Sequence, residues 1–161
     1  MVGPATRLLP IEVCQGVLAA IDAEPSVTTP PEAARLADSL MVFYALDREA
    51  SPVEVKQWAA QVIGIAQVFQ KFPRSLGKRV IDPANGLPSR LKFRPKPADV
   101  TEALEAEKKR RDLVRANALN HMQEREERVR VAEAEASYAK KKLSPEERAA
   151  QVRALLRAQR V

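Results

Sequence analysis

The sequence predicts an all-α protein: a small N-terminal helical bundle, a proline-rich basic segment and a long charged C-terminal helix. Apolar residues recur at helical spacing through residues 10–70. Five of the twelve prolines fall within residues 72–97, where that pattern ends. Residues 98–142 contain neither proline nor glycine and consist mainly of good helix formers. Because only 4% of the 161 residues are aromatic and much of the apolar content is alanine, we expect a modest core.

The first helix is expected over residues 10–23. Its apolar stripe consists of Val13, Val17, Leu18 and Ile21. Cys14 lies beside this stripe, and as the only cysteine it excludes a disulfide framework. We expect Cys14 to be a core residue rather than a nucleophile, because free cysteines are among the most buried residues. Pro25 pushes Glu24 out of the α region and ends the helix there.

Two further helices begin at matching sequence signals. Thr29 and Ser51 are each followed by proline, and three residues later by glutamate, at Glu32 and Glu54. In such a capping box the hydroxyl and the carboxylate each bond a free backbone N–H group at the helix start. We expect the second helix to run from Pro30 to about residue 46, and the third from residue 52 to about residue 70.

These three helices are expected to form the bundle, with Phe43 and Trp58 as its largest anchors. The residues expected to face inward are Leu36, Leu40, Phe43, Val55, Trp58, Ala59, Val62, Ile65, Ala66 and Phe69. Trp58 has Val62 one helical turn beyond it, so core packing is favoured over a role in base stacking.

The central segment predicts three short structures. A helix that begins at Pro73 presents Leu76, Val80 and Ile81 to the bundle. Residues 82–86 (Asp-Pro-Ala-Asn-Gly) form a turn, in which Asn-Gly tolerates a positive φ angle. Residues 87–96 alternate basic and apolar side chains, which predicts an extended segment with Leu91 and Phe93 held against the bundle. The side chains then expected to project outward together are Arg90, Lys92 and Arg94.

The long helix is expected over about residues 98–142. Its thin apolar stripe follows a period near 3.5 residues, but Arg125 interrupts it and many positions are alanine. We expect at best a weak coiled coil, or a helix that a partner stabilises. Ser144 and Glu147 form a third capping box before a short amphipathic helix. The residues expected to bind a protein partner are Val114, Met122, Val129, Val152, Leu155 and Leu156.

Charge is distributed unevenly along the chain, whose formal net charge is +6. Residues 1–70 carry 4 basic and 8 acidic groups, whereas residues 71–100 carry 8 basic and 2 acidic groups. The basic residues of this second stretch are Lys71, Arg74, Lys78, Arg79, Arg90, Lys92, Arg94 and Lys96. We expect them either to bind nucleic-acid phosphates, with steep salt dependence, or to form an ordinary solvated surface. We divide the chain into a helical domain over residues 1–96, which includes this basic segment, and a helical extension over residues 97–161.

No catalytic constellation is apparent in the sequence. His121 is the only histidine, and it stands in the charged helix without partners at metal-ligand spacing. Gly77-Lys78 lacks the upstream glycine and the following hydroxyl of a phosphate-binding loop. We therefore expect a non-enzymatic protein without cofactor or metal. Since no window approaches the ~18 apolar residues of a membrane span, we also expect no membrane segment and a cytoplasmic location.

One run of residues resembles a known type of protein. The run consists of Phe72-Pro73, Val80, Asp82-Pro83, Gly86-Leu87-Pro88, Leu91-Lys92-Phe93, Pro95, Val100 and Glu102-Ala103. It resembles small phage and prophage proteins, and the layout of residues 30–105 is loosely similar to that of phage helicase-loader proteins. The resemblance implies a compact helical domain and a tail, about residues 113–161, that contact a replicative helicase and its partners.

Three functions stay open at this point. The first is a helicase-loader-like accessory of phage-type DNA replication that binds a protein partner and the nucleic-acid backbone. The second is a phage structural, scaffold or packaging protein that oligomerises through its long helix. The third is a nucleic-acid-binding regulator, against which the absence of a helix-turn-helix spacing counts.

Overall fold

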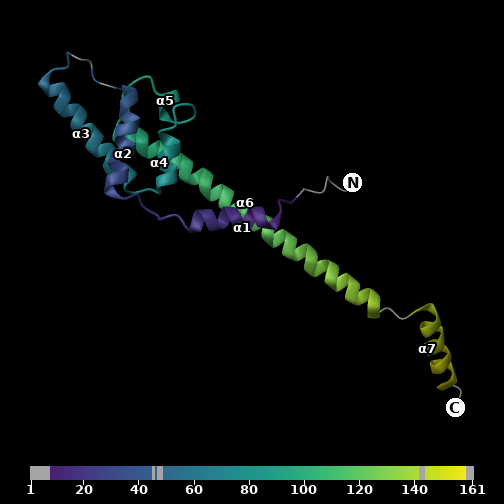
Figure 1. Cartoon of the computed structure of the whole chain (residues 1–161). Helices are drawn as coiled ribbons and strands as arrows, with labels where there is room; N and C mark the ends of the chain where they lie inside the picture. The colour runs from purple at the N-terminus through teal and green to yellow at the C-terminus, as the bar shows by residue number, and fades with distance from the viewer. Residues whose placement is uncertain (1–7, 45, 47–48, 142–143, 159–161) are drawn as a thin grey trace.

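The computed structural model describes residues 8–44, 46, 49–141 and 144–158, which confirm the all-α fold class. The elements are α1 (Ile11–Asp22), α2 (Pro30–Met41), the 3₁₀ turn η1 (Val42–Tyr44), α3 (Pro52–Phe69), α4 (Arg74–Val80), α5 (Leu87–Arg90), α6 (Pro97–Lys141) and α7 (Pro145–Ala158). None of the described residues forms a strand. Helices α2 to α5 gather at one end of α6, which then continues away from them toward α7 (Figure 1).

The core forms where α2, α3 and α4 meet the first turns of α6. Its largest fully buried side chains are Phe69, Leu40, Met41, Ile65 and Leu76. Val100 and Leu104 of α6 are also fully buried, so the start of the long helix is part of the core. Gly77 lets α4 approach α2 and α3 closely, because a Cβ at this position would lie 2.6 Å from Leu36 Cδ1 and 3.2 Å from Phe69 Cδ1.

Two of the three predicted capping boxes are confirmed. Ser51 Oγ accepts a hydrogen bond from the Glu54 N–H at 3.3 Å, while Glu54 Oε2 accepts one from the Ser51 N–H at 2.7 Å. Ser144 and Glu147 exchange the same two bonds, at 3.1 and 2.7 Å. At Thr29 the helix begins as predicted but the bonding prediction is wrong, because Thr29 Oγ1 donates to Glu32 Oε2 at 2.9 Å and caps no backbone N–H group.

The two confirmed boxes make these helix starts sensitive to acid. The hydrogen bond from the serine backbone, followed by the one from its side chain, lowers the pKa of Glu54 and of Glu147 below the ordinary value. A carboxyl group whose folded pKa lies below its unfolded pKa adds stability above the unfolded pKa. That stability is lost as the pH falls through the lowered folded pKa, so both caps are intact at neutral pH.

The predicted core extends too far along α2 and α3. Helix α2 ends earlier than predicted, at Met41, and Phe43 follows in η1 with half of its side chain exposed (50%), so its assignment as a core anchor is wrong. Val55 and Ala59 are exposed rather than inward-facing. Trp58 is partly buried against the core, and its buried indole Nε1 has no hydrogen-bond partner among the described residues. Neighbouring helices therefore cover only the second half of α3.

The central segment follows the prediction as far as the turn and then departs from it. Helix α4 buries Leu76 and Val80 as expected. Residues 87–90 form the one-turn helix α5 instead of an extended strand, and the extended arm begins at Leu91. Leu91 packs against the core as predicted, whereas Phe93 is 85% exposed and the prediction that it is held against the bundle is wrong.

Gly86 is required for a reason other than the one predicted. Its φ is −87°, and none of the described glycines has a positive φ, so the predicted turn forms without the positive φ that Asn-Gly tolerates. A Cβ at Gly86 would lie 2.3 Å from the Val80 carbonyl oxygen and 2.7 Å from those of Arg79 and Asp82. The Gly86 N–H donates to the Asp82 carbonyl at 2.8 Å. The turn therefore folds back onto the end of α4, and this close contact fixes where α5 begins.

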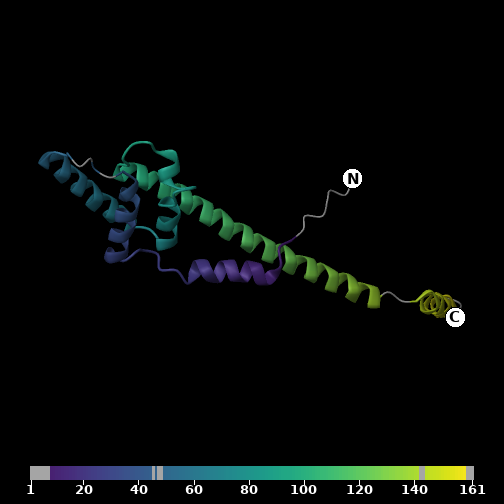
Figure 2. The same cartoon turned by 45° about the horizontal axis from the view of Figure 1, so that its top comes forward.

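Helix α1 runs antiparallel along the middle of α6 (Figures 1 and 2). Arg125 Nη2 donates to the Leu9 carbonyl just before α1, and Arg111 Nη2 donates to the Ile21 carbonyl near its end, both at 2.9 Å. Cys14 is buried as predicted, as is Ala118 of α6. Helix α1 therefore covers part of the apolar stripe predicted for a coiled coil, including Ala118, whereas Val114 remains 47% exposed.

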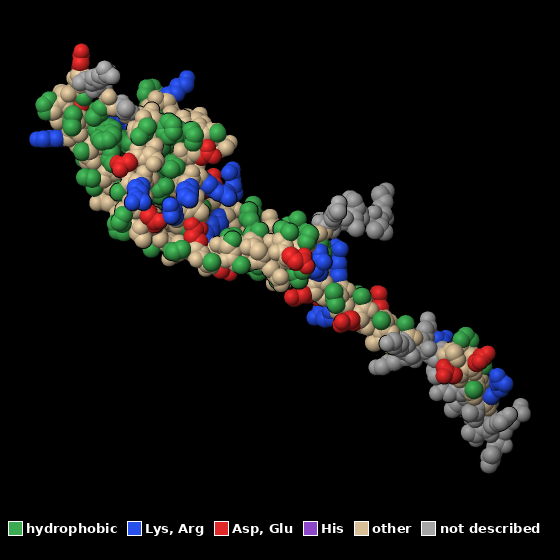
Figure 3. All heavy atoms as spheres, viewed as in Figure 1, with side chains coloured by type: hydrophobic (Ala, Val, Ile, Leu, Met, Phe, Trp, Pro, Cys, Tyr) green, Lys and Arg blue, Asp and Glu red, His purple; other side chains and the backbone are tan. Residues whose placement is uncertain are grey.

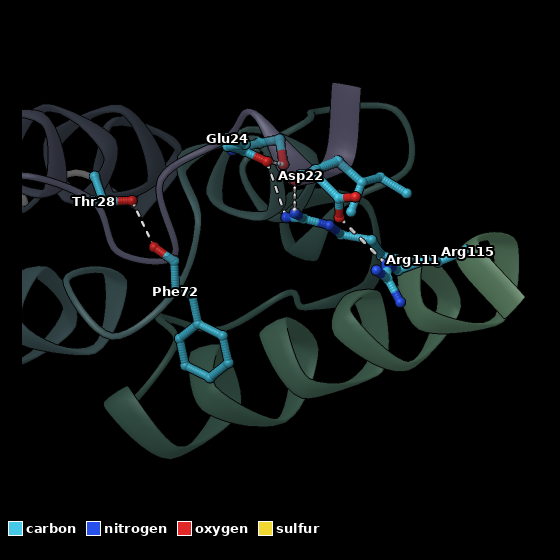
Figure 4. Close-up of polar contacts among 8 residues, drawn as sticks. Asp22, Glu24, Thr28, Phe72, Arg111 and Arg115 are labelled. Atoms are coloured by element: carbon cyan, nitrogen blue, oxygen red, sulfur yellow. Dashed lines mark hydrogen bonds and ion pairs between the residues drawn. The ribbon is translucent and has the colours of Figure 1, made fainter. Parts of the chain in front are cut away.

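A polar network ties the end of α1 to α4 and α6 (Figure 4). The Glu24 carboxylate accepts hydrogen bonds from the Ser75 N–H at 2.7 Å, from Ser75 Oγ at 2.6 Å and from Arg111 Nη1 at 2.9 Å. Arg115 Nε lies 3.4 Å from Asp22 Oδ1. From the sequence, Glu24 was predicted only to end the helix, and its tertiary role depends on Ser75 and Arg111, which are distant along the chain.

Candidate nucleic-acid interface

The eight basic residues predicted to bind nucleic acid do not form one continuous face. Arg79 and Arg90 meet at a polar hollow, Arg74 pairs with α2, and Lys92, Arg94 and Lys96 lie along the extended arm. Lys71 and Lys78 are exposed, directly after α3 and on α4. Lys and Arg side chains gather over α4 and the neighbouring part of α6, with Asp and Glu among them (Figure 3).

We call the polar hollow the arginine hollow. It is a cavity of about 520 Å³ lined by Arg79 of α4, Arg90 of α5 and Arg110 of α6, together with Asp82, Ala84, Asn85, Ser89 and Glu107. Arg90 Nη2 donates to the Asn85 carbonyl at 3.0 Å, which holds this guanidinium beside the turn. The fold thus brings together three cations from three helices.

The arginine hollow keeps an excess of positive charge. Glu107 is only 13% exposed and divides its oxygens between Arg110, at 3.2 Å, and Arg79, at 3.6 Å. Its Oε2 accepts no hydrogen bond from the described residues. Arg79 and Arg110 remain 61% and 64% exposed, so most of their N–H donors are accessible to an incoming anion.

Asp82 is the second carboxylate of the hollow, and residues of its own turn donate hydrogen bonds to both of its oxygens. Its Oδ1 accepts a hydrogen bond from the Ala84 N–H at 2.9 Å, and its Oδ2 accepts one from Asn85 Nδ2 at 3.3 Å. The bond from Ala84, followed by the one from Asn85, lowers the pKa of Asp82 below its ordinary value. The hollow at neutral pH therefore holds three guanidinium groups against two carboxylates.

Two of the predicted arginines are engaged with acidic side chains. Arg74 Nη1 lies 2.7 Å from Glu32 Oε1 and links α4 to α2. Arg94 lies near Glu54, where its charge adds to the hydrogen bonds from Ser51 in lowering the pKa of that carboxyl. Since Arg90 lines the hollow and Arg94 lies toward α3, the expectation that Arg90, Lys92 and Arg94 project together is wrong.

The basic arm, residues 91–96, runs from α5 to α6 without regular structure. Lys92, Phe93 and Lys96 are exposed, whereas Leu91 is partly buried and Pro95 is fully buried. The arm therefore continues directly from Arg90 of the hollow and presents two lysines and one aromatic ring to solvent.

The residues predicted to bind a protein partner lie in different settings. Val114 lines a hollow between α6 and α1 but is 47% exposed, and Met122 is partly buried. Val129 is exposed, as is every side chain of α6 from residue 126 to residue 139. Val152 of α7 is exposed, and the side chains of Leu155 and Leu156 lie outside the described residues. The exposed end of α6, residues 126–139, is therefore the part of the predicted stripe in which every described side chain is accessible to a partner.

Sequence reasoning missed Arg110 and Glu107, which belong to the arginine hollow. Arg110 stands in a run of four cations, residues 108–111, where no local signal distinguishes it. Glu107 carried a usable signal, because it continues the helical spacing of the core residues Val100 and Leu104 and so faces the body. The sequence alone does not reveal which helix lies opposite it.

In the described part of the chain, no group of three or more His, Cys, Asp or Glu side chains is arranged to hold a metal ion. None of its helices combines the length and the apolar character that a membrane span requires. Comparisons of this chain with protein-family models, with curated proteins and with solved structures found no match.

Proposed function

We propose that this chain is a non-enzymatic adaptor that binds the phosphate backbone of nucleic acid through the arginine hollow and the basic arm. The observation that carries the proposal is the meeting of Arg79, Arg90 and Arg110 in one hollow. The guanidinium group presents N–H donors in a rigid fork that matches phosphate oxygens. Because the helices fix the backbone at these three positions, bringing the cations together costs little backbone entropy when a phosphate binds.

The biological setting we propose is phage-type DNA replication, with a replicative helicase as the protein partner. The resemblance of the central segment to helicase-loader proteins supports this setting. The exposed end of α6 supports the protein contact, since it leaves the body and no other described helix covers it (Figure 1). A helix with so little tertiary support gains stability when a partner packs against it.

Changing Arg79, Arg90 and Arg110 together to alanine is expected to weaken nucleic-acid binding and flatten its salt dependence. Each lost phosphate contact lowers the slope of log K against log salt by about 0.7–0.9, so three contacts lower it by roughly 2. Fluorescence anisotropy with a labelled oligonucleotide, measured at several salt concentrations, gives this slope. Circular dichroism is expected to show unchanged helicity, because Arg79 and Arg110 are largely exposed.

The matched control changes Arg128, Arg130 and Arg153 to alanine. This control removes the same charge from exposed positions far from the hollow. We expect it to leave the salt slope nearly unchanged. Equal loss in both variants would mean that only net charge attracts nucleic acid. If the unaltered chain shows neither salt-sensitive DNA binding nor association with a hexameric helicase in sedimentation, the proposed function is wrong.

The second candidate function is a structural or scaffold component that oligomerises through α6. The observation in its favour is the exposure of Val129, Val131 and Tyr138 on the end of this helix, since an assembly would bury these side chains. Light scattering at micromolar concentration separates the two candidates. A large stable oligomer favours the structural protein, whereas a monomer or weak dimer favours the adaptor.

A further inference from the structure

We infer that Phe93 is a stacking platform for an unpaired base, so the nucleic acid bound by the basic arm is single-stranded. This inference rests on the proposed function, because it names the form of nucleic acid that the same interface takes. It differs from the charge-based proposal in that an aromatic ring, rather than a cation, selects the ligand.

The exposure of Phe93 is exceptional in this chain. Its side chain is 85% exposed, more than any other large apolar side chain of the described residues. Phe69 and Phe72 are buried, and Phe43 is half-exposed. Leaving a phenyl ring in water forgoes its burial free energy, which a ring that packs on the body would gain. The ring is therefore available to a ligand.

The arm that carries Phe93 is fixed to the body on both sides of it. Tyr44 Oη donates to the Leu91 carbonyl at 3.0 Å, and burial raises the pKa of this phenol, which keeps it protonated as a donor. Gln61 Nε2 donates to the Pro95 carbonyl at 2.9 Å, and Pro95 itself is buried. With Leu91 and Pro95 both held, the arm presents the ring in a defined position, and less conformational entropy is lost on binding.

The charges around Phe93 favour a polyanion over a protein surface as its ligand. Lys92 precedes the ring and Lys96 follows it, both exposed, while Arg94 between them lies near Glu54. Arg90 of the arginine hollow lies three residues before the ring, which is at most about 11 Å along an extended chain at ~3.6 Å per residue. A short strand can therefore place phosphates on the cations and a base on the ring at the same time.

The chemistry of the Phe93 ring favours a ligand whose bases are unpaired. Binding of single strands combines a positive groove for the backbone with aromatic rings on which bases stack, and it tolerates any sequence. In a duplex the base faces are already stacked on one another, so an exposed phenyl ring on the arm has no base face to meet. Phosphate contacts with Arg79, Arg90 and Arg110 remain possible with either form, and only the contribution of Phe93 distinguishes them.

The test compares Phe93→Ala, Phe93→Leu and Phe93→Tyr in the full chain, using an oligothymidylate and a duplex of equal length as probes. Loss of one stacked base corresponds to a drop of about 5-fold to 150-fold in affinity. We expect a drop of that order for Phe93→Ala with the single strand. Phe93→Leu is expected to bind only slightly better than Phe93→Ala, and Phe93→Tyr to bind nearly as well as the unaltered chain. Binding to the duplex is expected to stay unchanged in all three variants. The exposed position leaves thermal unfolding unaltered.

A spectroscopic readout reports stacking directly. The chain has one tryptophan, so Phe93→Trp in a Trp58→Phe background carries a single reporter at the proposed platform. We expect oligothymidylate to quench its fluorescence and the duplex to leave it unchanged. The Trp58→Phe background alone serves as the binding control.

Three other results of these binding experiments would overturn the stacking inference. If Phe93→Ala binds the single strand as well as the unaltered chain does, while the triple arginine variant fails to bind, the stacking inference is overturned and the proposed function stands. If Phe93→Ala affects only association with a helicase, the ring belongs to a protein interface and the inference is overturned. If the unaltered chain binds neither probe, the nucleic-acid binding in the proposed function fails and the inference fails with it.

Discussion

Replacing Phe69 with alanine is expected to lower the free energy of unfolding by about 3–5 kcal/mol. Phe69 is 1% exposed and the largest side chain that the core buries completely. It lies against Gly77, where α4 approaches closely. Because the helices are already tightly packed there, the neighbouring atoms cannot move in to fill the cavity that the ring leaves. Because small domains are stable by only about 5–15 kcal/mol, this variant is expected to be marginally folded at 25 °C. Denaturant unfolding followed by circular dichroism gives the value.

Phe43→Ala is the matched control, because it removes the same side chain from a half-exposed position outside the core. We expect a loss below about 1 kcal/mol, as for surface substitutions in general. Comparable losses in the two variants would show that Phe43 packs on the core, as its neighbour Tyr44 does, and would contradict the exposure described for Phe43.

Replacing Gly86 with alanine is expected to destabilise the fold by about 2–3 kcal/mol. The added Cβ would lie 2.3–2.7 Å from three backbone carbonyl oxygens, at Val80, Arg79 and Asp82. Carbonyl oxygens cannot rotate away as a side chain does, so the turn itself must move. Since this turn separates Arg79 from Arg90, the same variant is expected to weaken nucleic-acid binding at temperatures where it is still folded.

Gly16→Ala provides the opposite expectation in the same chain. Gly16 lies inside α1, and a Cβ there meets no atom within 4 Å. Alanine in a helix interior is favoured over glycine by about 0.5–1 kcal/mol, so this variant is expected to be more stable than the unaltered chain. Thermal unfolding of both variants side by side checks the pair, and destabilisation of Gly16→Ala would contradict the open space described for α1.

The fold class was predictable because helix signals are local. The capping boxes at Ser51 and Ser144 depend on residues three positions apart, and they formed as predicted. The predictions were wrong where burial or bonding depends on a residue that is distant along the chain or on a competing side chain. Periodicity identified the inward face of α3. It did not show that the other helices cover only the second half of that face and leave Val55 exposed. At Thr29 two side chains that each suit a backbone N–H group bond one another instead.

The candidate site was predictable only in part, for the same reason. Arg79 and Arg90 stood out as part of a cationic stretch of the sequence. Arg110 reaches them only because α6 packs against α4, a tertiary contact that charge counting does not contain. Alternation of residue types placed Leu91 and Phe93 together against the bundle, which is correct for Leu91 and wrong for Phe93. It did not predict that the backbone is held at Leu91 and Pro95 while the ring between them is left outside.

The length of α6 has a geometric consequence for anything that binds at both of its ends. A helix of 45 residues spans about 68 Å at ~1.5 Å per residue, so it acts as a fixed spacer between the bundle and α7. Removing seven residues from its exposed part shortens the spacer by about 10 Å and turns its far end by only about 20°. Such a deletion shortens the distance between the two ends of α6 but leaves their relative orientation almost unchanged. A deletion of five residues, at about 100° per residue, instead turns the far end to nearly the opposite side of the helix axis.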